Sequence, residues 1–220
     1  MRVVAVVAHP DDEVLGVGGT LARHARDGAD VAALVVADGA SSRYAAEMRD
    51  ELRIAGQKAA VRLGLGEIVF ADLPDQRLDS LPLIEVTRVV DQALDSWQPD
   101  IVYTHFAGDV NLDHAVVARA TWTACRPYQR RGVRELFAFE TPSSTEWGWP
   151  GLGDRFSANA FVDIAETLDA KIAAMACYDS ELRPEPHPRS LDALRTRAAY
   201  WGSVVGMSAA EPFMVLRTTR

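Results

Sequence analysis

The sequence predicts an α/β protein whose single domain, residues 1–220, holds a largely parallel, Rossmann-like sheet with helices on both faces. Short apolar runs alternate along the chain with segments whose apolar residues recur every three or four positions, which is typical of strand–helix–strand units. The length of 220 residues suits one domain with a sizeable core and leaves no room for a second full domain.

The first predicted strand covers residues 2–8 and reads Val-Val-Ala-Val-Val-Ala from Val3, without a polar interruption. Such a run is expected of a strand that is covered on both faces. Further apolar runs of this kind predict strands at 31–36, 68–70, 101–104, 136–139 and 161–164.

Helices are predicted between these strands. A glycine-rich turn at 16–20 is expected to precede a short helix that ends at Gly28. Two longer amphipathic helices are ended by Gly64 and Pro99. These two helices and one later helix are predicted at 42–63, 83–97 and 191–200.

Composition excludes several classes of protein. The net charge of −8 and the pI near 5.1 argue against a nucleic-acid partner or an anionic membrane surface, because both require clustered basic side chains. No segment is apolar enough to span a membrane, and the N-terminal apolar run is too short for a signal peptide, so we expect a cytoplasmic protein. Cys125 and Cys177 have no Cys-x-x-Cys spacing, which argues against a disulfide framework or a thiolate zinc site.

The most informative motif follows the first strand, where His9, Asp11, Asp12 and Glu13 occupy four of five consecutive positions. Ligands gather outside the carboxyl ends of strands in open α/β sheets, so these side chains lie where chemistry is usually done. The nearby glycines miss the G-x-G-x-x-G spacing of dinucleotide sites, and three carboxylates would repel a phosphate. The motif therefore favours a divalent cation, although an aspartate that merely caps the next helix remains the alternative.

A second polar cluster ends the strand at 101–104 and opens another helix. It contains His105, Asp109, Asn111, Asp113 and His114. Because neighbouring parallel strands end at the same edge of a sheet, we expect His114 to meet His9 and Asp12 across a crevice. Two imidazoles and one carboxylate leave one coordination position open, as in catalytic zinc sites. Helix capping by the acids is again the alternative interpretation.

These two motifs resemble those of the LmbE-like/PIG-L superfamily of zinc-dependent de-N-acetylases. The resemblance is carried by Ala-His-Pro-Asp-Asp-Glu at 8–13, Gly-Gly-Thr at 18–20 and Asp-Val-Asn-Leu-Asp-His at 109–114. Weaker similarities at 73–79, 143–147 and 186–190 extend it to about residue 213. The resemblance implies an α/β fold and one Zn²⁺ per chain, held by His9, Asp12 and His114.

The resemblance also implies that Asp11 is the general base. Many members have a histidine three positions before the second metal-ligand histidine, but this chain has Asn111 there. An asparagine amide can donate a hydrogen bond to an oxyanion but cannot deliver a proton at pH 7. His105 and His187 are therefore the other candidates for the acid or oxyanion partner, and Asp113 is expected to orient an imidazole.

The predicted activity is that of a metal-dependent amidohydrolase that removes the N-acetyl group from an amino sugar or glycoconjugate and releases acetate. Its partner would be this small molecule, and the oligomeric state is open, with a homo-oligomer among the options. Three alternatives compete. They are a zinc amidase for another amide such as a sugar–thiol conjugate, a phosphoacceptor-type regulatory domain that binds Mg²⁺, and a metal-binding module without turnover.

The segment 141–153 is predicted to be a loop, because it is rich in proline, glycine and hydroxyl residues and has no periodicity. Trp147 and Trp149 either pack onto the domain or flank a binding cleft. Arg43 and Arg77 are weaker candidates for substrate contacts, since a solvated surface position is the commoner place for an arginine.

Overall fold

The computed structural model describes residues 1–42, 47–127, 132–149, 151 and 155–219. Its seven-stranded sheet has the order β3-β2-β1-β4-β5-β7-β6. The first five strands are parallel, and β7 runs antiparallel to both of its neighbours. The bounds are β1 Arg2–Val7, β2 Asp30–Ala37, β3 Glu67–Leu73, β4 Ile101–His105, β5 Glu135–Phe139, β6 Ala160–Asp163 and β7 Ala210–Thr218. The predicted α/β fold with a largely parallel sheet is confirmed.

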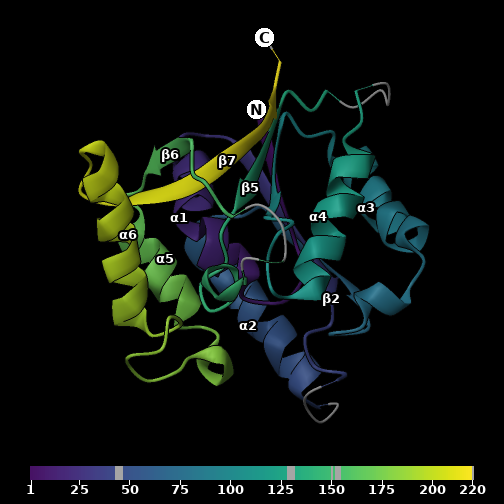
Figure 1. The fold of residues 1–220 in the computed structure, drawn as a ribbon, viewed down its shortest axis with the longest axis horizontal. Coiled ribbons are helices and arrows are strands. Elements are labelled where there is room, and N and C mark those ends of the chain that lie inside the picture. Colours follow the sequence, from purple (N-terminus) through teal and green to yellow (C-terminus); the bar gives the residue numbers. More distant parts are fainter. Residues whose placement is uncertain (43–46, 128–131, 150, 152–154, 220) are drawn as a thin grey trace.

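Helices cover both faces of the sheet (Figure 1). On one face lie α3 and α4, and on the other lie α1, α2, α5 and α6. Their bounds are α1 Asp12–Arg26, α2 Glu47–Leu63, α3 Leu83–Trp97, α4 Leu112–Ala124, α5 Leu168–Met175 and α6 Leu191–Val205. Alternate residues of β1 enter the two cores. Val4 and Val6 pack on the α3 and α4 side, and Val3 and Ala5 pack on the other, as expected of a doubly covered strand.

The prediction of a glycine-rich turn at 16–20 is wrong, because these residues lie inside α1, which begins at Asp12. Packing explains the glycines. A Cβ added to Gly16 would lie 2.2 Å from Cδ2 of Phe139, and one added to Gly19 would lie 2.8 Å from Cδ1 of Ile164. The glycines therefore allow α1 to pack closely against neighbouring elements, with a cost in helix propensity that tertiary packing offsets.

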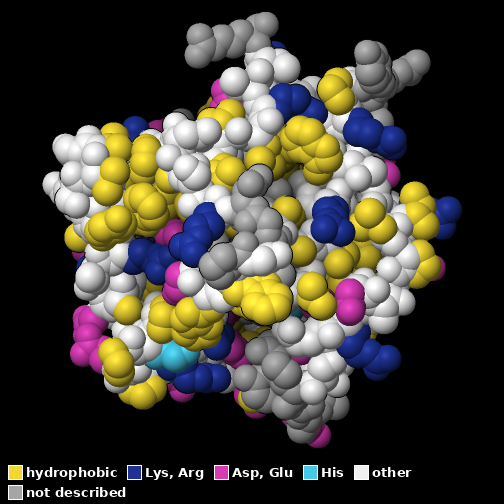
Figure 2. Space-filling view, viewed as in Figure 1, with side chains coloured by type: hydrophobic (Ala, Val, Ile, Leu, Met, Phe, Trp, Pro, Cys, Tyr) yellow, Lys and Arg dark blue, Asp and Glu magenta, His cyan; other side chains and the backbone are white. Residues whose placement is uncertain are grey.

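Among the α-helices and strands of the described residues, α5 and β7 were not predicted. Strand β7 joins the sheet between β5 and β6 and makes it mixed. Within the described residues, no helix is both long and apolar enough to cross a membrane. On the face shown in Figure 2, basic and acidic side chains are interspersed with apolar ones.

The topology places the two sequence motifs side by side. Strand β1 pairs in parallel with β4, so the residues that follow these strands emerge at one edge of the sheet. The chain runs outward from β1 to β2 and β3 and then returns to β4 on the other side of β1. A crevice at such a reversal of strand order is where open α/β sheets bind ligands.

Candidate active site and metal centre

Three ligand atoms converge above the ends of β1 and β4. His9 Nδ1 lies 3.3 Å from Asp12 Oδ2 and 3.3 Å from His114 Nε2, and the third side of the triangle, from His114 Nε2 to Asp12 Oδ2, is 3.4 Å. A tetrahedral ion with bonds of about 2.0–2.1 Å separates its ligand atoms by about 3.3–3.4 Å. The three buried side chains therefore fit one such ion and leave its fourth position to another group.

Each imidazole of the triangle is also held by a buried carboxylate on its far side. Asp113 Oδ2 lies 3.1 Å from His9 Nε2, and Asp109 Oδ2 lies 3.3 Å from His114 Nδ1. A carboxylate at one ring nitrogen places the proton there and directs the lone pair of the other nitrogen toward the centre of the triangle. Asp113, which is expected to orient an imidazole, thus contacts His9, across the crevice.

Both orienting carboxylates are themselves fixed. Asp113 accepts hydrogen bonds from the backbone N–H groups of Gln76 and Leu78 at 2.8 and 3.0 Å. Asp109 accepts from the hydroxyl groups of Ser144 and Thr145, the latter at 2.6 Å. The loop after β3 and the loop after β5 thereby contribute to the orientation of the two histidines.

The electrostatics of the triangle favour a positive charge at its centre. Burial alone would lower the pKa of His9, but hydrogen bonds to Asp113 and Asp12 raise this pKa to about 9. Burial likewise opposes protonation of His114, and the charge of Asp12 with the hydrogen bond to Asp109 raises its pKa to about 10. A divalent cation can take the place of these protons, because metal ligands must be deprotonated.

Asp11, the expected general base, is the N-cap residue of α1 and has a left-handed backbone with φ 102°. Its backbone N–H donates to Glu13 Oε2 at 3.1 Å, and Glu13 Oε1 accepts from the Tyr178 hydroxyl at 2.6 Å. Burial, followed by the negative charge of Asp12, raises the pKa of Asp11 well above its usual value, while the charge of Arg189 opposes this.

Asn111 serves as the N-cap of α4, since its side-chain oxygen accepts from the Asp113 N–H at 3.0 Å. With the oxygen so engaged, the amide NH₂ remains as the donor group of this side chain. The residue also lines the cavity at the metal triangle. Asn111 therefore caps α4 with its side-chain oxygen and also lines the cavity.

The two remaining candidate histidines lie in different surroundings. His105 is fully buried beneath the triangle, where its Nε2 accepts from the Ala8 N–H at 2.9 Å and its ring stacks on that of His114 at 4.0 Å. Burial, followed by the charge of His114, lowers the pKa of His105 to about 4. This imidazole therefore packs beneath the ring of the candidate ligand His114.

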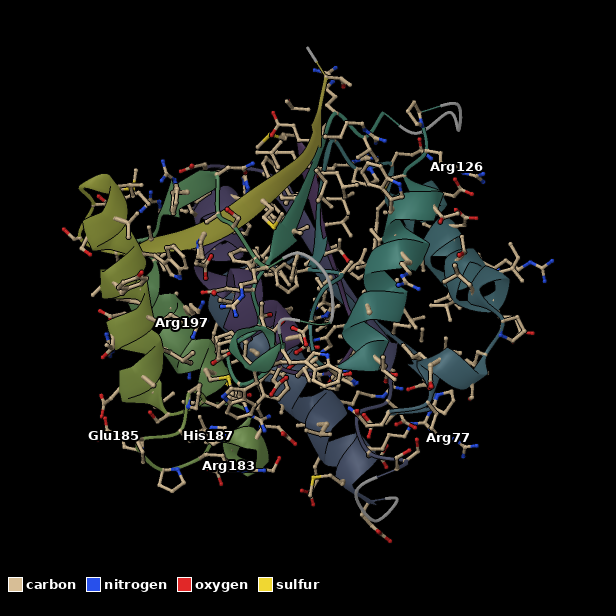
Figure 3. All side chains as sticks on the ribbon, in the orientation of Figure 1. Arg77, Arg126, Arg183, Glu185, His187 and Arg197 are labelled. Atoms are coloured by element: carbon tan, nitrogen blue, oxygen red, sulfur yellow. The ribbon has the colours of Figure 1, made fainter. Side chains whose placement is uncertain are left out.

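His187 lies instead on the partly exposed connector before α6, near Arg183 and Glu185 (Figure 3). Its Nδ1 accepts from the Arg189 N–H at 3.1 Å, and its ring meets the edge of Trp147 at 5.9 Å. Desolvation and then the charge of Arg189 lower the pKa of His187. The imidazole is therefore mostly neutral at pH 7 and offers its Nε2–H as a hydrogen-bond donor.

A small cavity of about 100 Å³ opens at the triangle. Its described lining includes the ligand side chains, Asp11 and Asn111, together with Gln76, the loop at 141–144, Glu181 and Arg189. The two loop tryptophans are more than half exposed, and Trp149 lines a separate cavity of about 280 Å³ with Phe106, Phe156 and Trp201. Within the predicted loop at 141–153, a short 3-10 helix spans Thr145–Trp147, and residues 150, 152 and 153 lie outside the described residues. Arg77 is exposed and points away from this region (Figure 3), and Arg43 lies outside the described residues.

Several residues of the site were not found from the sequence. Asp109 was interpreted only as a possible cap, although its place in the second motif was a usable signal. Arg189 and Tyr178, by contrast, reach Asp11 and Glu13 from more than 160 residues along the chain. No local pattern marks Tyr178, and the weak similarity at 186–190 assigns no role to Arg189, because only the tertiary fold brings the two side chains to the site.

The fold and the site together define an α/β protein with a His-His-Asp triangle that could hold a metal ion and an adjacent carboxylate, both at the carboxyl edge of its sheet. The profile of the PIG-L family, described as GlcNAc-PI de-N-acetylase, matches residues 4–125. The chain therefore belongs to the PIG-L family. The matched range contains both motifs and all three candidate ligands.

Comparison with individual proteins agrees with this assignment. The 1D-myo-inositol 2-acetamido-2-deoxy-alpha-D-glucopyranoside deacetylase of Mycobacterium sp. (strain JLS) is 28% identical over 86% of this chain and 77% of its own. The structure of the conserved protein TT1542 from Thermus thermophilus is 25% identical, with a TM-score of 0.81 over 99% of this chain and 96% of that one.

The same fold also occurs in an enzyme with a different reaction. GalB, the 4-carboxy-2-hydroxymuconate hydratase from Pseudomonas putida KT2440, is 22% identical and has a TM-score of 0.78 over 100% of this chain and 99% of its own. At this identity the likeness concerns the fold alone. The reaction of the present chain must therefore be argued from its site.

Proposed function

We propose that this protein is a zinc-dependent hydrolase that removes an acetyl group from the nitrogen of a glucosamine-containing small molecule. The observation that carries the proposal is the triangle of His9, Asp12 and His114, with sides of 3.3–3.4 Å, next to the buried carboxylate of Asp11. Three protein ligands with an open fourth position are the pattern of catalytic zinc sites.

A zinc ion held by these ligands would supply Lewis acidity for the amide carbonyl and would lower the pKa of a water molecule to about 7. Asp11 would take the proton of that water as it attacks the carbonyl carbon. We assign the return of this proton to the leaving nitrogen to Asp11 as well, because burial favours the protonated form of its carboxyl.

The other candidate residues receive supporting roles. The Asn111 amide would donate to the carbonyl oxygen as negative charge develops there. Asp113 would keep His9 in the ligating tautomer, and His105 would hold the ring of His114 from below. His187, which is not among the described lining residues of the cavity, would donate a hydrogen bond to a part of the substrate that lies outside it, where a neutral imidazole can act without delivering a proton.

The size of the cavity supports a small acyl group. About 100 Å³ is well below the 300–1,000 Å³ of typical ligand pockets, so an acetyl group fits while the rest of the substrate lies outside. The glucosamine part of the proposal rests on the family description and on the mycobacterial relative, both of which are named for N-acetylglucosamine derivatives. A sugar–thiol conjugate is an alternative amide substrate of the same chemistry.

The phosphoacceptor alternative is less compatible with the site. Such a domain needs a lysine near its acidic cluster, and this chain has only Lys58 and Lys171. Lys58 is exposed on α2, and the Lys171 ammonium is buried between Leu15 O at 2.9 Å and Glu211 Oε1 at 2.6 Å. Two imidazoles in the cluster also favour zinc over Mg²⁺.

The proposal is tested by elemental analysis of the purified protein together with acetate release from a panel of N-acetylated sugars and non-sugar acetamides. Asp11→Asn should retain zinc and lose about two to four orders of magnitude in turnover, the usual scale for a lost proton-transfer group. His114→Ala should lose the metal. The control is Asp79→Asn, an exposed aspartate next to Leu78 in sequence, which should keep both the metal and the turnover. Wild-type turnover in Asp11→Asn would refute the assigned role of this carboxylate.

A further inference from the structure

The Asp11 carboxylate is in contact with the guanidinium group of Arg189, to which the sequence alone assigns no role. Arg189 Nη1 lies 2.9 Å from Glu181 Oε2 and 3.3 Å from Asp11 Oδ2. Arg189 also lines the cavity at the metal triangle, and its side chain is 19% exposed. The guanidinium therefore joins Asp11 to Glu181, a residue of the segment that follows α5.

The geometry around Asp11 requires such support. A non-glycine residue at φ 102° lies outside the favoured backbone regions, and conformations of this kind persist when their surroundings fix them. Glu13, held by Tyr178, fixes the backbone N–H of Asp11 from one side. Arg189 contacts the carboxylate from the other side.

The negative charges around Asp11 are a second reason why its carboxylate needs a cationic partner. Asp11 lies beside the buried carboxylates of Asp12 and Glu13, so its own carboxylate is repelled from both neighbouring positions. Among the residues that the structure describes, Arg189 is the cationic side chain in contact with Asp11. Removal of the guanidinium would leave the Asp11 carboxylate without a partner that opposes this repulsion.

The position of the Arg189 guanidinium leaves one of its hydrogen-bond donors without a partner among the described residues. Arg189 Nε is buried and has no hydrogen-bond partner in the described part of the chain. An unpaired buried donor costs about 1–3 kcal/mol, so a purely structural arginine would be expected to pair it. The anchor to Glu181 holds the group near Asp11 in spite of this cost.

We propose that Arg189 is a positioning residue for Asp11: Glu181 anchors the guanidinium, and the guanidinium holds the Asp11 carboxylate toward the cavity. Its importance for turnover rests on the proposed hydrolase function, whereas the link between the two side chains does not.

A measurement without substrate tests the link. In ¹⁵N-labelled protein, the guanidinium resonances of Arg189 are assigned by their loss in Arg189→Lys and are then compared between wild type, Asp11→Asn, Glu181→Gln and the control Asp79→Asn. We expect these resonances to shift in Asp11→Asn and Glu181→Gln and to stay in place in Asp79→Asn. Unchanged resonances in Asp11→Asn would overturn the proposal.

Kinetics test the consequence for turnover. Arg189→Ala should keep its zinc and a KM within about twofold of wild type but lose about 10- to 100-fold in kcat, as expected when a reacting group is misplaced by about 1 Å. Added guanidinium ion should restore part of this loss. Arg183→Ala is the matched control, because Arg183 lies on the same connector and donates to the carbonyl groups of Ser180 and Leu182.

Each result decides between the two proposals. Wild-type kcat in Arg189→Ala would overturn the positioning role. If Arg189→Ala fails to fold, Glu181→Gln replaces it, since this variant keeps the guanidinium and loses the anionic anchor, and wild-type kcat there would overturn the role equally. If the wild type releases no acetate from any substrate, the hydrolase proposal fails, and the resonance comparison alone decides whether Arg189 holds Asp11.

Discussion

The substitution Asp113→Asn isolates the contribution of an orienting carboxylate to metal affinity. The two Asp113 oxygens accept three hydrogen bonds. Oδ1 accepts from the Leu78 N–H at 3.0 Å, and Oδ2 faces both the Gln76 N–H at 2.8 Å and His9 Nε2 at 3.1 Å. An asparagine has a single acceptor oxygen, so it cannot reproduce this arrangement in either orientation of its amide.

The two orientations have different costs. With the amide oxygen toward His9, the buried Leu78 N–H loses its acceptor, at a cost of about 1–3 kcal/mol in the free energy of unfolding. With the NH₂ group toward His9, Nε2 must accept, and the proton moves to Nδ1, the atom that faces the metal position. We expect zinc affinity to fall about 10- to 100-fold, or about 1.4–2.7 kcal/mol.

The assay is competition for zinc between the protein and a chromophoric chelator, with the midpoint of thermal unfolding measured on the chelator-treated protein. The midpoint should fall by about 2–12 °C, because 1 kcal/mol corresponds to about 2–4 °C in a protein of this size. Asp109→Asn should weaken zinc binding similarly through His114, and the exposed Asp79→Asn should not. Zinc affinity within twofold of wild type in Asp113→Asn would refute the orienting role.

Two further predictions concern packing and pH. Gly16→Ala places a Cβ 2.2 Å from Cδ2 of the buried Phe139 ring of β5, so the free energy of unfolding should fall by about 1–3 kcal/mol and the melting point by about 2–12 °C. An unchanged melting curve would contradict this prediction and show that the ring can move. In the metal-free protein, the raised pKa values of His9 and His114, about 9 and 10, contribute stability that is complete below about pH 6.5, the unfolded-state pKa. Calorimetry of the metal-free protein should therefore show that this stability is lost as pH rises toward 10. The zinc-bound protein should not show this loss, because zinc has replaced the protons. Constant stability of the metal-free protein from pH 6.5 to 10 would contradict the raised pKa values of the two histidines.

The convergence of the two motifs could be predicted because it depends on local signals and one topological rule. An uninterrupted apolar run identifies β1, and a polar cluster directly after it identifies the edge where side chains such as His9 emerge. The same signals recur at β4. Parallel pairing then brings His114 to His9 without any information on the rest of the fold.

The unpredicted features depend on contacts between distant parts of the chain. Gly16 is helical because the space next to α1 is occupied by Phe139, and no local rule distinguishes a glycine in a turn from one at a close helix contact. Strand β7 begins with Ala210, Glu211 and Pro212, so its sequence opens without the alternating apolar pattern of a strand. Its position in the sheet follows from pairing with β5 and β6.

The two halves of the chain contribute different residues to the site, and this affects how the site can adapt to a substrate. The profile of the family ends at residue 125 and so contains the candidate metal ligands as well as Asp11 and Asn111. The later half supplies Ser144 and Thr145 against Asp109, Tyr178 against Glu13, and Arg189 against Asp11. Of these later residues, Ser144 and Arg189 also line the described cavity, together with residues 141–143 and Glu181. A change that adapts this lining to another substrate would therefore also act on the residues that contact Asp109 and Asp11. Substitutions at the cavity-lining residues of the loop after β5 should therefore alter kcat together with KM, whereas a change at Arg189, which acts on Asp11, should act mainly on kcat.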